Sequence, residues 1–262
     1  MATLLQDHDV SATQAAIIRA TTLPKARIGL IIPSSNRSSE PQFQHLAPAG
    51  LAVHITRLQM TGPWRKPVPE LMGDIARAAS ALADSKCDVI VFHCTGTSME
   101  DGPEADHRIT DLIARETGAI ALSTGQAVVE ALRALALKRL VVISPYVQST
   151  NDHERDYLHA LGFEVLHDVA LGLSGGNEYI TVPVSRWIEV VRANTRPTAD
   201  GYFLSCTNTT QIDIIERLER ETGKPVVNSN QAMIWAALRR LAPKLGPVKP
   251  IPGLGRLMTV GA

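Results

Sequence analysis

Two cysteines stand in nearly the same local sequence, and each follows a short apolar run. Cys94 opens Cys-Thr-Gly-Thr after residues 89–92, and Cys206 opens Cys-Thr-Asn-Thr after residues 202–204. A thiolate is a nucleophile, and a neutral thiol is a proton donor. Two such groups that face one ligand from opposite sides can act on both faces of a small molecule. The pair therefore predicts two-sided thiol chemistry.

An internal repeat relates the two cysteines. They lie 112 positions apart (94 and 206), and the same shift aligns 27–31 with 139–143, Pro33 with Pro145 and Gly50 with Gly162. Beyond the cysteines the shift is 105, and it aligns 116–118 with 221–223 and 126–127 with 231–232. We therefore expect two related lobes. A pseudo-twofold axis between them would bring together equivalent strand ends, each with one thiol.

The residues after each cysteine are small and polar, which favours convergence of backbone N–H groups near the sulfur. We expect Thr95 and Gly96 to form such a turn, and Thr207 and Asn208 to lead from Cys206 into a helix. Lowering a thiol pKa from about 8.5 to about 7 requires roughly 2 kcal/mol, and a helix N-terminus supplies about 0.3–1, or about 2 at most. We expect one thiolate and one thiol that share a coupled titration.

Polar loop residues could hold a carboxylate beside these thiols. A bare carboxylate 4 Å from a thiolate would repel it by about 4 kcal/mol at an effective dielectric constant of 20. Charge-assisted hydrogen bonds contribute about 1.5–3 kcal/mol each, so two or three of them offset this repulsion. The candidate donors besides backbone N–H groups are Ser34, Ser35, Asn36, Thr95, Tyr146, Asn177, Thr207 and Asn208.

Apolar runs alternate with helical patterns along the chain. Strand candidates begin near residues 28, 53, 89, 120, 141, 165, 203 and 226. This alternation predicts an α/β fold of parallel βαβ units with both sheet faces covered. The loops at the carboxyl ends of the strands then carry the site. We also expect a short leading helix over 10–21 and a Pro/Gly-rich tail without a regular element over 243–255.

Composition excludes several classes of function. The formal net charge is zero and aromatic residues make up 4% of the chain, which argues against nucleic-acid binding. No apolar stretch approaches the roughly 18 residues of a membrane span. The first nine residues lack a basic leader and a long apolar centre, so we expect no secretory signal and a cytoplasmic location. Three cysteines, an odd count, argue against a disulfide framework.

Other candidate residues have structural interpretations. Cys87 is expected in the core, and His93 is expected to be structural because its side chain points opposite to that of Cys94. The pair Gly175-Gly176 lacks a phosphate-binding fingerprint. The acidic and histidine residues of the loop after Cys94 match no standard ligand spacing (Asp101, Glu104, Asp106 and His107). We therefore expect neither a metal nor a cofactor.

Three further motifs carry a family resemblance: residues 32–36 (IPSSN), 228–232 (NSNQA) and 252–257 (PGLGRL). Together with the two halves and the paired Cys-Thr segments, they resemble the cofactor-independent aspartate/glutamate racemase superfamily. The chain is most similar to the branch of maleate isomerases and arylmalonate decarboxylases, over roughly residues 25–257. The resemblance implies a homo-oligomer, either a dimer or a tetramer.

The resemblance also implies two flavodoxin-like lobes related by a pseudo-twofold axis, with the active site between them. The last strand and helix of each half are expected to cross into the other lobe. Lobe 1 would then hold residues 25–118 plus 224–246, and lobe 2 residues 119–223. Residues 1–24 form an N-terminal extension, and 247–262 a C-terminal tail.

The resemblance to maleate isomerases implies roles for both cysteines. Cys94 would add to an alkene carbon of a cis-diacid as a thiolate, and Cys206 would protonate the other carbon. Rotation and elimination would then release the trans-diacid. Asn36, Tyr146 and Asn177 match family positions that hold substrate carboxylates. Arylmalonate decarboxylases carry glycine at the first cysteine position, so Cys94 argues against that activity, while the segment 95–98 is more polar than in some maleate isomerases.

Three other functions are compatible with a cysteine pair. A two-base racemase or epimerase of an amino acid, hydantoin or related carboxylate would use one thiol on each face of an acidic carbon. A racemase of amino acids would also need a counter-charge for the substrate ammonium, for which the candidates are Glu40, Glu100, Asp101 and Glu178. The other two are a redox pair and a cytosolic small-molecule sensor.

Overall fold

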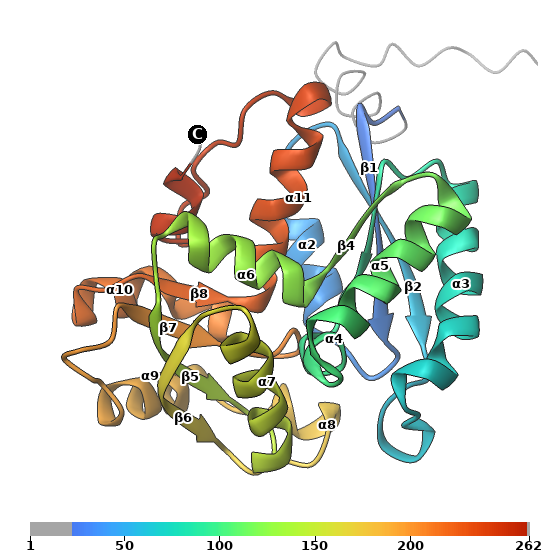
Figure 1. Ribbon diagram of the computed structural model, residues 1–262. Coiled ribbons are helices and arrows are strands. Elements are labelled where there is room, and N and C mark those ends of the chain that lie inside the picture. Colours follow the sequence, from blue (N-terminus) through green and yellow to red (C-terminus); the bar gives the residue numbers. More distant parts are fainter. Residues whose placement is uncertain (1–22, 261–262) are drawn as a thin grey trace, which may run out of the picture.

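The computed structural model describes residues 23–260. These residues form two four-stranded parallel sheets flanked by helices (Figure 1). The first sheet has the order β2-β1-β3-β4 and the second the order β6-β5-β7-β8, so each half arranges its strands in the same way. The predicted two-lobed α/β fold is confirmed. The helix expected over 10–21 lies outside the described residues.

The strands begin within two residues of their expected positions. Those of the first sheet are β1 (Ala26–Pro33), β2 (Leu51–Leu58), β3 (Val89–Phe92) and β4 (Ile120–Ser123). Those of the second are β5 (Arg139–Ser144), β6 (Glu164–Ala170), β7 (Gly201–Leu204) and β8 (Val226–Asn228). Every residue of β3 and β7 is buried, as expected for central strands with both faces covered.

Helices and short 3-10 turns connect the strands. In the first half they are α2 (Ser39–Leu46), η1 (Gly62–Trp64), α3 (Val68–Asp84), α4 (Thr95–Met99), α5 (Gly102–Thr117) and α6 (Thr124–Ala134). In the second half they are α7 (Gln148–Ala160), α8 (Gly176–Tyr179), α9 (Val184–Ala193), η2 (Gln211–Ile214), α10 (Ile215–Thr222), α11 (Ser229–Leu245) and η3 (Arg256–Thr259). None of the described helices is long and apolar enough to cross a bilayer.

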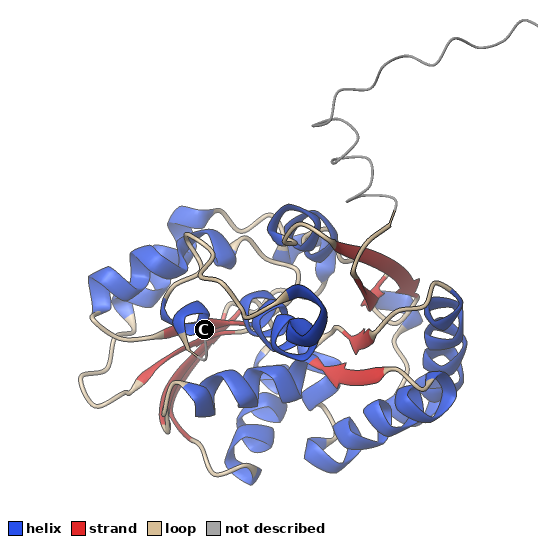
Figure 2. Ribbon diagram, turned by 90° about the horizontal axis from the view of Figure 1, so that it is seen from above, coloured by secondary structure: helices blue, strands red, loops and turns tan. Residues whose placement is uncertain are grey.

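The two halves exchange their last helices but not their last strands. β4 pairs with β3 and β8 pairs with β7, so the expectation that these strands cross to the other lobe is wrong. The helix after each strand does reach across. α11 packs on β1 and β3 of the first sheet, α6 contacts β8 of the second, and the two helices contact each other (Figures 1 and 2). One apolar core therefore runs through both halves, while the lobe boundaries at 118 and 223 stay a prediction.

Side-chain caps fix the starts of the two exchanged helices at equivalent positions. The Ser123 hydroxyl accepts from the backbone N–H of Gln126 at the start of α6. Asn228 caps α11 in a capping box with Gln231. Because each cap directly follows the last strand of its half, the helix leaves the sheet at a fixed point.

The C-terminal segment differs from its expectation only at its start. α11 continues through Pro243 to Leu245, residues 246–255 carry no helix or strand as expected, and η3 follows them. Leu257 and Met258 are buried, and the Gln231 side-chain amide donates to the Leu254 carbonyl at 2.7 Å. The tail is therefore part of the core that covers the start of α11.

Candidate active site

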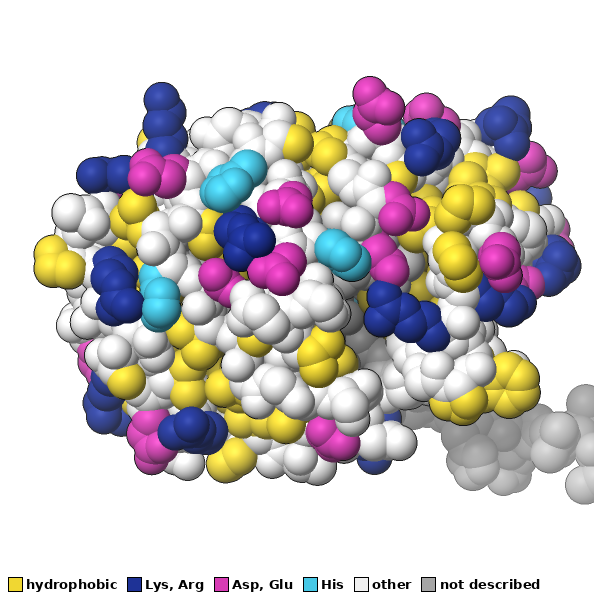
Figure 3. Space-filling view, turned by 60° about the horizontal axis from the view of Figure 1, so that its bottom comes forward, with side chains coloured by type: hydrophobic (Ala, Val, Ile, Leu, Met, Phe, Trp, Pro, Cys, Tyr) yellow, Lys and Arg dark blue, Asp and Glu magenta, His cyan; other side chains and the backbone are white. Residues whose placement is uncertain are grey.

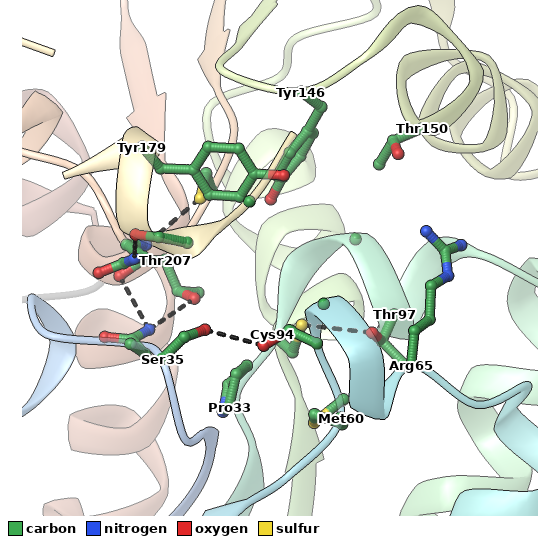
Figure 4. Close-up of a pocket in the computed structure, with 18 of the residues that line it drawn as sticks. Pro33, Ser35, Met60, Arg65, Cys94, Thr97, Tyr146, Thr150, Tyr179 and Thr207 are labelled. Carbon is green, nitrogen blue, oxygen red and sulfur yellow. Dashed lines mark hydrogen bonds between the residues drawn. The ribbon is translucent and has the colours of Figure 1, made fainter. Parts of the chain in front are cut away.

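A cavity of about 240 Å³ lies between the carboxyl ends of the two sheets, and both Cys94 and Cys206 line it. The residues that line it come from both halves. Tyr146 and Tyr179 lie on one side of the cavity, and Thr97 and Arg65 lie on the other side with Cys94 (Figure 4). The molecular face in Figure 3 carries interspersed basic and acidic side chains without a patch of one sign. The repeat thus brings its two thiols to one cavity, as the sequence predicts.

Cys94 stands between β3 and α4 and is partly exposed to the cavity. Its thiol hydrogen-bonds to the Thr97 hydroxyl at 3.4 Å. Burial raises the pKa of Cys94 above its ordinary value, although hydrogen bonds from the hydroxyl and backbone N–H of Thr97 lower it. The nearby carboxyls of Glu100 and Glu154 add to the rise in pKa.

Cys206 follows β7 with a backbone φ of 104°, a conformation that a residue with a side chain rarely adopts. The Asn208 backbone N–H donates to its sulfur at 3.3 Å, and the Cys206 N–H donates to the Ser229 hydroxyl at 3.2 Å. Burial raises the pKa of Cys206 to about 12, even though the Tyr146 hydroxyl and the Asn208 N–H stabilise the thiolate. Cys206 is therefore a neutral thiol.

The surroundings of the two thiols differ from the sequence expectation in two respects. The backbone N–H groups were expected to favour a thiolate, but both thiol pKa values are raised because burial outweighs the hydrogen bonds to sulfur. Cys206 also does not stand at a helix start. Residues 207–210 form an irregular turn that ends in the 3-10 turn η2, so the chain does not pass directly from Cys206 into an α-helix.

Six of the nine residues expected around the substrate line the cavity: Ser35, Asn36, Gly96, Tyr146, Thr207 and Asn208. Two of their side chains also join the halves. The Asn36 amide donates to the Thr207 carbonyl and hydroxyl at 3.3 and 3.1 Å. The Asn208 amide accepts from the Arg37 N–H at 2.8 Å and donates to the Gly176 carbonyl at 2.7 Å. These hydrogen bonds hold the loops of the two halves together at the edge of the cavity.

Three predicted residues do not line the cavity. Ser34 is exposed outside it. Thr95 is buried, and its hydroxyl donates to Ser229 at 2.9 Å. Asn177 is exposed and accepts hydrogen bonds from the Arg37 guanidinium. Its neighbours Gly176 and Tyr179 line the cavity instead, because α8 turns their side of the loop inward.

Sequence reasoning missed several lining residues, above all Tyr179, Arg65 and Thr97. The Tyr179 ring lies edge-on to Tyr146, with centroids 5.4 Å apart and planes at 75°. Arg65 forms an ion pair with Glu100 at 2.5 Å at the cavity mouth. A tyrosine three residues after a glycine pair is the one sequence signal that could have pointed to Tyr179.

The acidic residues considered as counter-charges for a substrate ammonium are either bound to other side chains or lie outside the cavity. Glu100 pairs with Arg65, Glu40 pairs with Arg57 at 2.5 Å, and the Glu178 carboxylate accepts from Ser174 at 3.0 Å. Asp101 is exposed and does not line the cavity. Among residues 23–260, no unpaired carboxylate lines the cavity to meet a substrate ammonium, which disfavours an amino acid racemase.

The structural interpretations of His93 and Cys87 are confirmed. His93 is fully buried between the Thr124 hydroxyl and the Asn230 amide oxygen, at 3.0 and 2.9 Å. Burial lowers the pKa of His93 to about 4, so the ring is neutral. Cys87 belongs to the core between the first sheet and α3. Within the described part of the chain, no group of three or more His, Cys, Asp or Glu side chains is placed to hold a metal ion.

Paired thiols at equivalent strand ends of two similar α/β halves define a class of two-lobed proteins with a shared central site. A family model described as arylmalonate decarboxylase matches residues 28–258, and the chain belongs to this family. The predicted membership in the branch of maleate isomerases and arylmalonate decarboxylases is confirmed.

Several relatives are similar over most of their length. The maleate isomerase of Nocardia farcinica is 29% identical over 242 residues, which cover 88% of this chain and 95% of the relative. The arylmalonate decarboxylase of Bordetella bronchiseptica is 30% identical over 181 residues, which cover 68% of this chain and 74% of the relative. A solved structure shows the Nocardia farcinica maleate cis-trans isomerase as a cysteine-to-serine mutant with a covalently bound succinylcysteine intermediate. It superposes with a TM-score of 0.82 at 28% sequence identity, and the match covers 89% of this chain and 98% of that one.

Proposed function

We propose that this protein is a cis–trans isomerase of a small unsaturated dicarboxylate of the maleate type. The observation that carries the proposal is the pair of thiols, Cys94 and Cys206, on one cavity with polar groups around it. The similar Nocardia farcinica enzyme, described with a covalent succinylcysteine, supports addition of a thiol to the alkene. The reaction needs no oxidant, reductant or metal, because the bonds that form in its first half break again in its second.

Their different settings assign the two thiols different roles. Cys94 is partly exposed and has the Thr97 hydroxyl and N–H as partners, so it is the residue that ionises and attacks. Cys206 keeps its proton because burial raises its pKa to about 12, so it is the acid. A thiol held neutral beside a substrate dianion avoids a third negative charge in the cavity.

The proposed reaction proceeds in three steps. The Cys94 thiolate forms a C–S bond to one alkene carbon, and the electron pair of the π bond takes the Cys206 proton at the other carbon. The resulting single bond rotates by half a turn. The Cys206 thiolate then removes a proton from the carbon that it protonated, the C–S bond breaks, and the trans-diacid leaves with both cysteines in their starting states.

Hydrogen-bond donors around the cavity support binding of the two carboxylates. The Tyr146 hydroxyl, the Thr97 hydroxyl and the Ser35 hydroxyl line it. Residues 95–97 form the first turn of α4, whose N–H groups have no acceptor within the helix. Arg65 at the mouth supplies a positive charge. We place the carboxylates between these groups, with Thr95 and Asn177 acting only through their neighbours.

The direct test is incubation with maleate while fumarate formation is followed. We expect turnover that is lost in Cys94→Ser and in Cys206→Ser, and a succinyl adduct on Cys94 in the Cys206→Ser variant by mass spectrometry. Turnover of maleate by the double serine variant, or no turnover while both thiols still react with iodoacetamide, would reject the proposal. Solvent deuterium exchange into a resolved hydroxy acid or amino acid would instead identify an epimerase.

The expected homo-oligomer and cytoplasmic location belong to the same proposal. Light scattering coupled to size-exclusion chromatography measures the first, and fractionation of the source cells measures the second.

A further inference from the structure

A buried carboxyl lies behind the cysteine pair and has no role in the reaction as described so far. Glu154 of α7 is fully buried and does not line the cavity. Its Oε1 accepts a hydrogen bond from the Ser205 hydroxyl at 2.6 Å. Ser205 directly precedes Cys206, and its own N–H donates to the Ile143 carbonyl at 2.9 Å. Glu154 therefore holds the strand end from which the strained backbone of Cys206 starts.

The other oxygen of this carboxyl is unpartnered. Oε2 of Glu154 is buried and has no hydrogen-bond partner, and no cation within the described residues pairs with this side chain. An ionised carboxylate without a cation is costly to bury, so the group carries a proton. Burial raises the pKa of Glu154 to about 8, against the opposing effect of the Ser205 hydrogen bond.

The charged groups on the neighbouring elements are engaged elsewhere. α7 packs against α4, α5 and β6. On α5, Asp106 accepts from Tyr157 and Ser123, and on β6, Asp168 accepts from Gln148 and Asn151. Arg155, the nearest cation in sequence, pairs with Asp152. On the cavity side the titratable groups that interact with Glu154 are Cys94, Cys206 and Tyr146, and for each of them the Glu154 charge raises the pKa.

We propose that Glu154 is a positioning residue for the thiol pair: it holds Ser205 and Cys206 in place and, being uncharged near neutral pH, adds no negative charge beside Cys94 there. The hydrogen bond to Ser205 supports the left-handed backbone of Cys206. A neutral carboxyl places no additional negative charge beside the thiolate and the substrate dianion. The link to turnover rests on the proposed function, whereas the effects on the two thiols do not.

The charge effect is tested by Glu154→Gln, which keeps an oxygen acceptor for Ser205 but cannot ionise. The rate of Cys94 alkylation by iodoacetamide is measured against pH for the wild-type protein and the variant. In the wild type, Glu154 ionises first and opposes the thiolate. We therefore expect the midpoint to move down by about half a pH unit or more in the variant. An unchanged midpoint would overturn the proposal, because a purely structural carboxyl would alter stability but not this midpoint.

A matched control is Asp106→Asn, which removes another buried carboxyl on a helix packed against α7. Burial also raises the pKa of Asp106, to about 6, but its partners are Ser123 and Tyr157. We expect no shift of the Cys94 midpoint in this variant. An equal shift in both variants would show a general charge effect and would also overturn the assignment to Glu154.

The positioning effect is tested by Glu154→Ala, which leaves the Ser205 hydroxyl without its partner. We expect Cys206 to be alkylated at least several-fold faster, because its strand end loosens, and maleate turnover to fall about tenfold or more. If Cys206 in the folded Glu154→Ala variant is alkylated at the wild-type rate, the positioning role of Glu154 is overturned. If neither protein turns over maleate but the alkylation shifts occur, the proposed function fails and the role of Glu154 stands.

Discussion

The Asn36 side chain binds Thr207 through both the backbone carbonyl and the hydroxyl of that residue, so one amide joins the two halves at the edge of the cavity. Its oxygen is also occupied, because it accepts from the N–H groups of Ser38 and Ser39 at 3.0 and 2.9 Å. Asn36 thus fixes the start of α2 and the turn after Cys206 together.

Replacing this amide should loosen the two halves at the site. In Asn36→Ala, the buried hydroxyl of Thr207 and the N–H groups of Ser38 and Ser39 lose their partner. We expect a loss of about 1–3 kcal/mol in the free energy of unfolding, measured in urea, and a fall in turnover. Gln42→Ala is a control, since its side chain also crosses to the second half, at the Thr209 carbonyl, but outside the cavity. A larger loss of turnover in that variant than in Asn36→Ala would contradict this interpretation.

The glycine pair at 175–176 offers a matched test of how closely the α8 loop approaches the first half. A Cβ atom at Gly176 would stand 2.6 Å from the Ser35 hydroxyl, whereas one at Gly175 would meet nothing within 4 Å. Gly175 has an extended backbone with φ of −174°, which any residue adopts. We expect Gly176→Ala to displace the loop that carries Tyr179 and to lower kcat/KM, while Gly175→Ala behaves as wild type. Equal kinetics of the two variants would show that the approach does not matter.

The ion pair at the mouth should tune substrate binding. Arg65 is the partner of Glu100, and both line the cavity. Arg65→Ala removes a positive charge near an incoming dianion, so we expect KM to rise about threefold to tenfold, and the salt dependence of kcat/KM to weaken. Glu100→Gln should have the opposite effect on KM and should lower the pKa of Cys94, because the Glu100 charge raises it. A rise of KM in both variants would argue for a structural role of the pair.

Glu154 should make stability fall as pH rises from about 4.5 towards about 8. In the folded protein this carboxyl keeps its proton up to a pKa of about 8, whereas in the unfolded chain it ionises near its ordinary value of 4.5. Between these values the folded state binds more protons, so the free energy of unfolding decreases with pH, by at most about 1.4 kcal/mol per pH unit.

The informative range for this measurement is about pH 6.5 to 8, bounded above by the raised pKa of Glu154. Below pH 6.5, His93 makes the free energy of unfolding increase with pH, which is opposite to the effect of Glu154, because its pKa is lowered to about 4 in the folded state. We expect urea unfolding of the wild type to show the decrease across this range, and Glu154→Gln to show a flatter profile. Parallel profiles of the two proteins would mean that Glu154 is ionised throughout.

The sequence predicts the sheets well because the central strands β3 and β7 are short apolar runs and the repeat aligns each strand with its partner in the other half. Val89–Phe92 and Gly201–Leu204 are recognisable from composition alone, and the spacing of Cys94 and Cys206 already implies that they meet. The exchange of strands expected from the family was wrong, whereas the exchange of helices follows from the apolar faces of α6 and α11.

Side-chain direction in loops is what sequence reasoning could not supply. Asn177 and Tyr179 lie two residues apart, yet only the tyrosine faces the cavity, because α8 is a single turn with no periodic pattern to orient it. The sign of the thiol pKa shifts depends on how much of the chain covers each sulfur, which emerges only from packing. Glu154 looks like an ordinary surface residue of a helix start until the fold buries it.

The exchanged helices say something about how such a chain can arise. A half-length protein with this topology would lack the helix that the other half adds to its core, and the final helix of a second copy could supply it, as in a domain-swapped homodimer. Fusing two copies into a single polypeptide keeps that architecture while freeing each half to diverge. One sulfur can then become the attacking group and its twin the proton carrier, a division of labour that a symmetric ancestor could not have encoded.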